Sequence, residues 1–167
     1  RAGKIRYFGL SNADAADIDR AAALHPVVNL QIGHSLIDPA DPGTLDACLR
    51  NRVGVTAYSP LAGGWLVRDY RPGEPYPPGS RMTLRPEPYR DLEQRAATGL
   101  IDTLRTKASG HGVSLPVLAL AWVLAEPAVD AVILGPHRPE HLAPALAALE
   151  LDLDEAERTA LTESARR

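Results

Sequence analysis

Short apolar runs alternate along the chain with longer segments that carry apolar residues at helical spacing. The apolar runs, at 5–10, 27–32, 53–58 and 129–134, are each typical of a buried strand. The third run contains no charged residue, which is expected when helices bury both faces of a parallel sheet. Strands that alternate with helices predict right-handed β–α–β units, so we expect a parallel α/β fold.

Residues typical of helix N-termini lie between these apolar runs. Asn12 can cap a helix that ends near Leu24, and Asp41-Pro42 opens a second helix. Further helices are predicted over 89–109, 114–126 and 138–149, and from Asp154 onward. Each predicted strand is therefore followed by at least one predicted helix.

The segment 59–88 interrupts this alternation. It is rich in proline and glycine and shows no sustained periodicity. Loops of this length in compact domains are usually functional. We therefore expect a lid loop at 59–88 within a single domain that spans residues 1–167.

Length and composition exclude several classes of protein. A chain of 167 residues with 45% hydrophobic residues can bury a core, and its net charge of −3 gives no basic footprint for nucleic acid or an anionic membrane. No apolar run reaches the ~20 residues that span a bilayer, and the first residues lack a signal-peptide pattern. The single cysteine, Cys48, is expected to be a core thiol. We expect a cytoplasmic protein with a small neutral or anionic ligand and no metal site.

Polar residues follow three of the predicted strands, where the sites of parallel α/β folds are built. Asn12 and Gln31 together offer the donors and acceptors that a carboxamide needs, and Tyr58 offers a flat ring. Jointly the three residues suit a nicotinamide. Each alone also has an ordinary structural interpretation, as a helix cap, a satisfied polar side chain or a core aromatic residue.

Two further segments offer contacts for phosphate. The turn Ala62-Gly63-Gly64 lets backbone amides approach an anion, and Arg81 in the lid can pair with phosphate. The segment 135–141 places cations at a predicted helix start, which the helix dipole disfavours unless an anion is present. Paired glycines are common in turns and exposed cations are commonly only solvated, so these residues alone leave both interpretations open.

Several segments together resemble motifs of the aldo-keto reductase family, in the family's order and spacing. They are Gly3 to Asn12, Tyr58 to Gly64, Leu118 to Val123, Ile133 to Gly135 and Arg138 to Leu142. The resemblance covers nearly the whole chain and is greatest to the bacterial and potassium-channel β-subunit-like branches. It implies a (β/α)8 TIM barrel, of which this chain supplies strands five to eight as a half barrel, with the lid and a C-terminal helix. The strand pattern alone leaves an open four-stranded sheet as the alternative.

The resemblance also implies a cofactor site. Ser11, Asn12 and Gln31 would hold the nicotinamide carboxamide, and Tyr58 would stack on the ring. The rest of the implied cofactor-binding set lies along the pyrophosphate path and at the adenine end: Ser59, Pro60, Leu61, Gly63, Arg81, Gly135, His137, Arg138 and His141.

The adenine end departs from the family pattern. Pro144-Ala145 stands where members commonly have Glu-Asn, and His137 precedes Arg138 where many members have Lys or Arg. A histidine is only partly charged at neutral pH. The expected cofactor is therefore NADPH, with NADH as the alternative.

No catalytic residue can be matched in this sequence. The family uses an Asp, Tyr, Lys and His tetrad that belongs to the first half of its barrel. Tyr58 would lie behind the ring, and His34 is expected to be a substrate-pocket or surface residue. Trp65 is expected to wall the substrate pocket or to pack in the core.

The expected function is that of the cofactor-binding half of an oxidoreductase that transfers hydride between NADPH and a small aldehyde or ketone, inactive by itself. The alternatives are a catalytically silent NADPH-binding module, like the channel β-subunits, and a half barrel that closes by dimerising. The chain begins at Arg1 rather than Met, so we expect a fragment whose partner is a missing N-terminal half or a second copy. The expected substrate is a small carbonyl compound, and neither nucleic acid nor a membrane is an expected partner.

Overall fold

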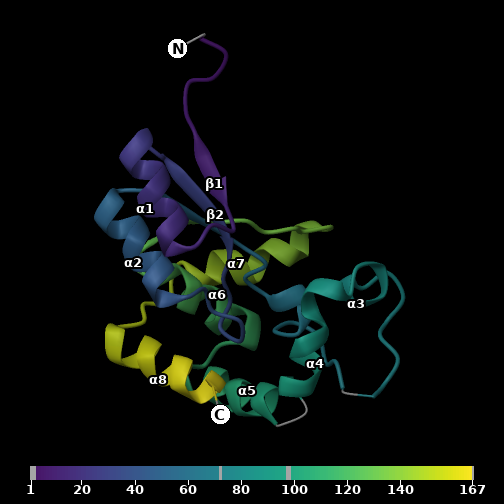
Figure 1. Cartoon of the computed structure of the whole chain (residues 1–167). Helices are drawn as coiled ribbons and strands as arrows, with labels where there is room; N and C mark the ends of the chain where they lie inside the picture. Colours follow the sequence, from purple (N-terminus) through teal and green to yellow (C-terminus); the bar gives the residue numbers. More distant parts are fainter. Residues whose placement is uncertain (1–2, 72, 97–98, 167) are drawn as a thin grey trace.

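The computed structural model describes residues 3–71, 73–96 and 99–166. Four strands in these ranges, β1 (Gly9–Ser11), β2 (Asn29–Gly33), β3 (Gly54–Tyr58) and β4 (Val129–Val132), form one parallel sheet in the order β1-β2-β3-β4 (Figure 1). The predicted parallel α/β arrangement is confirmed. Residues 1–2, 97–98 and 167 of the predicted domain, and residue 72 of the predicted lid, lie outside the described residues.

Helices connect the strands and follow the last one. The α-helices of the described ranges are α1 (Ala15–Leu24), α2 (Pro42–Asn51), α3 (Arg81–Leu84), α4 (Arg90–Ala96), α5 (Leu100–Gly110), α6 (Leu115–Leu124), α7 (Ala143–Ala148) and α8 (Glu155–Arg166). Three short 3-10 turns are η1 (Ala62–Gly64), η2 (Glu87–Tyr89) and η3 (Pro139–Leu142). None of the helices in the described part is long and apolar enough to cross a membrane.

Side-chain caps begin the helices that follow β1 and β2. The Asp41 carboxylate accepts hydrogen bonds from the Thr44 backbone N–H at 2.9 Å and the Thr44 hydroxyl at 3.1 Å, as the sequence predicted for α2. The cap of α1 is Asp14, whose carboxylate accepts from the Asp17 N–H at 2.8 Å. The prediction of Asn12 as the α1 cap is therefore wrong, which leaves the Asn12 side chain available at the strand end.

Helices cover one face of the sheet. Leu30, Val55 and Ala57 point toward this face and are fully buried. Helices α1 and α2 lie beside β1 and β2 on this side (Figure 1). The core of the described chain is therefore a layer between the sheet and its helices.

The opposite face of the sheet is polar. Asn29, Thr56 and Tyr58 are half-buried, and Gln31 is exposed. The Asn29 amide donates to Gly54 O at 3.1 Å and to Thr56 Oγ1 at 2.9 Å, so polar side chains bridge neighbouring strands on this face. The expectation that both faces of the third strand are buried is wrong, because its residues alternate as in a sheet covered on one side.

Helix α6 is the apolar centre of the helical layer. Nearly all of its residues are buried, and Pro116 occupies its first turn, where no intrahelical N–H is needed. The Trp122 indole N–H donates to Thr162 Oγ1 at 3.0 Å. Arg158 of α8 forms a 2.6 Å ion pair with Glu126. These contacts hold α8 against α6 and satisfy the polar atoms that the packing buries.

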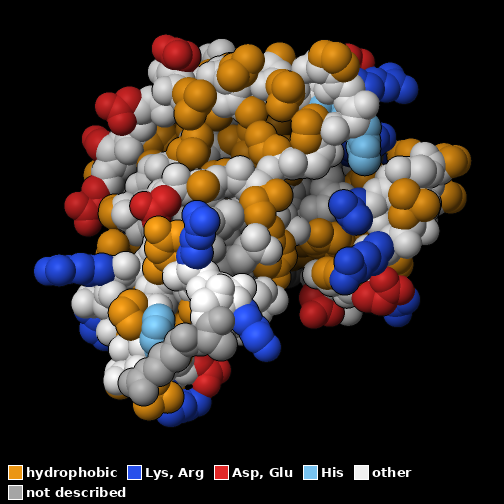
Figure 2. Space-filling model, turned by 90° about the horizontal axis from the view of Figure 1, so that it is seen from above, with side chains coloured by type: hydrophobic (Ala, Val, Ile, Leu, Met, Phe, Trp, Pro, Cys, Tyr) orange, Lys and Arg blue, Asp and Glu red, His pale blue; other side chains and the backbone are white. Residues whose placement is uncertain are grey.

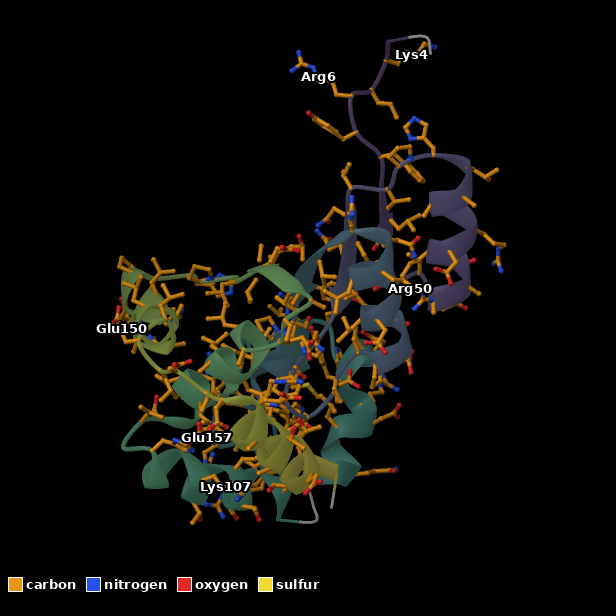
Figure 3. The ribbon with its side chains drawn as sticks, turned by 90° about the vertical axis from the view of Figure 1, so that its left-hand side faces the viewer. Lys4, Arg6, Arg50, Lys107, Glu150 and Glu157 are labelled. Carbon is orange, nitrogen blue, oxygen red and sulfur yellow. The ribbon has the colours of Figure 1, made fainter. Side chains whose placement is uncertain are left out.

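Three predicted elements differ from the structure. Ile5 and Tyr7 are 73% and 75% exposed, so the first strand begins only at Gly9, and the preceding segment with Lys4 and Arg6 extends away from the sheet (Figure 3). The helix predicted over 89–109 is divided into α4 and α5. The predicted lid loop contains α3 and two 3-10 turns rather than irregular chain throughout.

The burial of Cys48 and Trp65 decides two further predictions from the sequence. Cys48 is fully buried in the core, as predicted, and burial raises the pKa of its thiol. Trp65 is fully buried and packs edge-on against Tyr70 and Tyr76, with ring centroids 5.2 and 6.1 Å away. Of the two interpretations of Trp65, core packing is therefore the observed one.

The buried face of α6 provides a test of this core. Leu118 is fully buried, so Leu118→Ala is expected to lower the free energy of unfolding by about 2–5 kcal/mol, measured by urea denaturation followed by far-UV circular dichroism. The matched control is Leu124→Ala on the same helix, where the side chain is 37% exposed and the loss should be clearly smaller. Equal losses for the two variants would contradict the packing described for α6.

Candidate functional site

The carboxyl ends of the strands meet at one edge of the sheet, because all strand pairs are parallel. Ser11 pairs with Gln31 at the end of β1, and Gly33 pairs with Tyr58 at the ends of β2 and β3. Parallel α/β folds bind their ligands at this edge. The polar residues that the sequence placed after separate strands are therefore brought together.

Tyr58 spans the end of β2. Its hydroxyl donates to Asn12 Oδ1 at 2.8 Å, and its ring lies over Gly33, where a Cβ atom would be 3.3 Å from the ring. The Asn12 backbone N–H donates to Gln31 O at 3.0 Å, and Asn12 has a positive φ of 53°. Asn12, Gln31 and Tyr58 thus form one linked group, in which the Asn12 amide NH2 and the exposed Gln31 amide have no hydrogen-bond partner among the described residues.

A hollow of about 310 Å³ opens beside this group, between the strand ends and the lid. Its walls come from the segment after β2, the segment after β3, and α3 and η2 of the lid. The lining residues are Gly33, His34, Ser35, Asp38, Tyr58, Ser59, Ala62, Arg81, Arg85, Pro88, Tyr89 and Leu92. Three of the predicted cofactor-binding residues, Tyr58, Ser59 and Arg81, belong to this lining.

Tyr89 contacts the end of β3 and so holds the lid there. Its hydroxyl and the Ser59 hydroxyl are 2.8 Å apart and share a hydrogen bond. Its ring covers Gly63, where a Cβ atom would lie 2.8 Å from the ring carbons Cγ and Cδ2. Gly63 also has a φ of 66°, so glycine is required there by backbone conformation and by space. Sequence reasoning missed Tyr89, since nothing along the chain shows that it folds back over the glycine turn.

His34 is buried at the back of the hollow. It is 2% exposed, its Nδ1 accepts from the Ala40 N–H at 3.0 Å, and its ring stacks on Trp122 at a centroid distance of 4.8 Å. Burial, and next the positive charge of Arg158, lower the pKa of His34 to about 4. His34 is therefore neutral at neutral pH, and its burial rules out the surface position that was one of the two expected for it.

The remaining predicted site residues lie outside the hollow. Pro60 is buried, and Leu61 packs against the larger core cluster. The predicted adenine end, Gly135, His137, Arg138 and His141, is exposed in the segment after β4. There the Arg138 guanidinium lies 3.8 Å from the Glu140 carboxylate, and the His137 N–H donates to His141 Nδ1 at 3.3 Å.

This arrangement, a linked polar group at the carboxyl edge of a parallel sheet beside a cationic lid, can be compared with known proteins. A model of the aldo/keto reductase family matches residues 1–166. The chain belongs to the aldo/keto reductase family. Both the family and the parallel α/β fold agree with the motifs that the sequence carries at its strand ends.

Individual members of the aldo/keto reductase family support this assignment. The chain is 32% identical to the aldo-keto reductase yakc of Schizosaccharomyces pombe, named for NADP(+), with 93% of this chain and 46% of the relative covered. It is 29% identical to the NADH-specific methylglyoxal reductase of Escherichia coli, with 98% and 49% covered. The chain thus spans about half the length of these relatives.

Solved structures match the fold over a similar share. The glycerol dehydrogenase AKR11B4 of Gluconobacter oxydans superposes with a TM-score of 0.77 at 21% identity, over 97% of this chain and 49% of that structure. The thermostable aldo-keto reductase Tm1743 superposes with a TM-score of 0.66 at 31% identity, with the same coverage of 97% and 49%. The first likeness is one of fold, and the second adds sequence similarity.

The contact between Gly63 and Tyr89 generates a first prediction about the site. Gly63→Ala is expected to displace Tyr89 and to speed limited proteolysis of the lid several-fold, because the new methyl group meets the ring. Gly79→Ala is the matched control, since Gly79 has a φ of 72° but no atom within 4 Å of the added Cβ. Both variants carry a backbone strain of about 1–2 kcal/mol. Equal proteolysis rates would show that Tyr89 does not hold the lid.

The pKa of His34 generates a second prediction, on pH. Below about pH 6.5 the unfolded chain protonates this histidine, whereas the folded chain resists protonation until about pH 4. The free energy of unfolding should therefore fall as the pH drops through this window, by about 3 kcal/mol in full. His34→Gln should remove this part of the pH dependence in urea denaturation between pH 7 and pH 4.5, whereas His111→Gln, at an exposed position, should keep it. An unchanged profile in His34→Gln would contradict the neutral buried state.

Proposed function

We propose that this chain is the cofactor-binding part of a reductase that transfers hydride between NADPH and a small aldehyde or ketone. The observation that carries the proposal is the linked group of Asn12, Gln31 and Tyr58 at the carboxyl edge of the sheet, next to a hollow lined by Arg81. Family membership supports the same reaction class. When bound, a dihydronicotinamide supplies the hydride.

The residues present fit a nicotinamide. The unpartnered amide groups of Asn12 and Gln31 offer a donor pair and a carbonyl acceptor to a carboxamide. Tyr58 is held flat across Gly33, and its hydroxyl is already bonded to Asn12, so its role is to support the ring and not to donate a proton. Ser11, exposed at the end of β1, completes the polar edge.

We assign the phosphates to the lid side, where Ser59, the η1 turn with Gly63, and Arg81 would bind them. Pro60 and Leu61 shape this turn from the core side. At the adenine end we assign Gly135, His137, Arg138 and His141. The neighbouring Glu140 offsets part of the Arg138 charge, and the relatives include both an NADP(+) and an NADH-specific enzyme, so NADH is the alternative cofactor.

We further propose that the chain supplies strands five to eight of a (β/α)8 barrel. Support comes from four parallel strands with helices on one face, a polar opposite face, and relatives of about twice the length. The proton donor for the carbonyl oxygen would then be carried by the other half. The chain is expected to bind and orient the cofactor and to lack reductase activity by itself.

Cofactor binding tests the first part of this proposal. Gln31→Ala should weaken NADPH binding by roughly 10-fold without loss of stability, because the side chain is exposed, and one or two lost hydrogen bonds amount to about 1.4 kcal/mol. The dissociation constant is measured by titration of NADPH fluorescence. Gln94→Ala, at an exposed position on α4, is the control and should bind as the unmodified chain does. If the chain binds neither NADPH nor NADH, or if both variants bind equally well, the nicotinamide assignment fails.

Turnover tests the second part. The chain with saturating NADPH and a panel of small aldehydes should give no consumption of NADPH above the rate without protein, followed at the absorbance band of the reduced cofactor. Measurable reduction by this chain would show that it carries its own proton donor and would overturn the assignment of that group to other strands.

A further inference from the structure

Two guanidinium groups of the lid face the hollow. Arg81 begins α3, and Arg85 follows one turn later, where its backbone N–H donates to Arg81 O at 2.8 Å. Both side chains line the hollow and are exposed, and neither has an ion-pair partner among the described residues. Figure 2 shows Lys and Arg side chains on the right-hand side of the molecule, which is the side of the lid helices in Figure 1.

Two nearby arginines outside the hollow are instead paired with carboxylates. Arg71 lies 3.3 Å from Asp69, and Arg90 lies 4.0 Å from Glu87. Two like charges one helical turn apart repel each other unless an anion lies between them. The pair at the hollow therefore has the arrangement of an anion site.

The other charged and titratable groups of the hollow do not neutralise this pair. Asp38 is the one carboxylate among the lining residues, and His34 is buried and neutral at neutral pH. The linked hydroxyls of Ser59 and Tyr89 lie in the same lining, and one of their two protons remains free to donate. A net positive hollow with hydroxyl donors matches the chemistry of phosphate.

The turn that carries the two arginines is anchored. Met82 is 4% exposed and packs in the core, and the Ser80 hydroxyl accepts from the Thr83 N–H at 3.3 Å. The backbone positions of Arg81 and Arg85 are thus set by packing and by a cap, at a turn that borders the hollow.

We propose that Arg85 is a second phosphate-binding residue, which together with Arg81 holds the diphosphate of a nicotinamide dinucleotide against the Ser59 and Tyr89 hydroxyls. This inference rests on the proposed cofactor function. The diphosphate is the group proposed because the two arginines line the same hollow as Tyr58, the proposed support of the nicotinamide ring.

The test is titration of the chain and three variants with NADPH, NADH and inorganic pyrophosphate. Arg85→Ala is expected to weaken binding of both dinucleotides by roughly 10-fold and of pyrophosphate likewise, and to reduce the dependence of binding on salt concentration. Arg85→Lys should recover only part of this loss, because an ammonium keeps the charge but lacks the two-pronged donor geometry. Arg90→Ala is the control, at an exposed arginine of α4 outside the hollow, and should bind as the unmodified chain does.

The outcomes separate this inference from the proposed function. If the chain binds dinucleotide and Arg85→Ala binds equally well, the role of Arg85 is wrong and the cofactor function stands. If Arg85→Ala weakens NADPH but not NADH, the group bound is the 2′-phosphate and the diphosphate assignment is overturned. If the chain binds pyrophosphate through Arg85 but no dinucleotide, the cofactor function fails, and Arg85 is a ligand for free anions.

Discussion

The backbone pairing of parallel strands is the constraint on which the rest of this structure depends. A parallel pair requires a crossover between its strands, and here each crossover places a helix, α1, α2 or α6, on the same face of the sheet. The same pairing puts every carboxyl end at one edge. The buried layer of helices and the polar edge are therefore two results of one arrangement, and the site cannot be displaced without breaking the register of the sheet.

The pairing of β3 with β4 has one irregularity, a bulge at Asp130, and a hydrogen bond from the neighbouring strand compensates for it. Asp130 is an extra residue in β4, since Val55 pairs with Val129 while Thr56 pairs with Ala131. At this bulge the Asp130 carboxylate accepts a hydrogen bond from the Val55 N–H at 2.8 Å, so a backbone donor that would lack a partner is satisfied. The bulge lets β4 join the sheet while keeping Ala57 and Val132 paired on the helical side.

The lid obtains its position from a few buried or close contacts and not from regular structure. Met82 and Trp65 insert into the core, and Tyr89 covers Gly63 and bonds to Ser59. Between these anchors the polypeptide is free to present polar and cationic side chains toward the strand ends. A segment rich in proline and glycine can therefore form one wall of a binding hollow without a long helix or strand of its own.

The polar face of the sheet agrees with the observation that this chain spans about half the length of its relatives. A sheet with helices on one side buries its apolar residues there, and Asn29 and Thr56 bond to each other across the other side. In the barrel proposed above, side chains of further strands would meet this face. The open face and the coverage of about half of each relative are consistent with each other.

Local patterns in the sequence predicted the parallel α/β class, the Asp41 cap, the buried Cys48 and the family, because each depends on residues close together in the chain or on motif order. The tertiary structure decided the rest. It moved the α1 cap to Asp14, and it left Ile5 and Tyr7 exposed because the segment before Gly9 extends away from the sheet. It also brought Arg85 and Tyr89 to strand ends far away in sequence, a proximity that arises from three-dimensional packing and leaves no trace in spacing or composition.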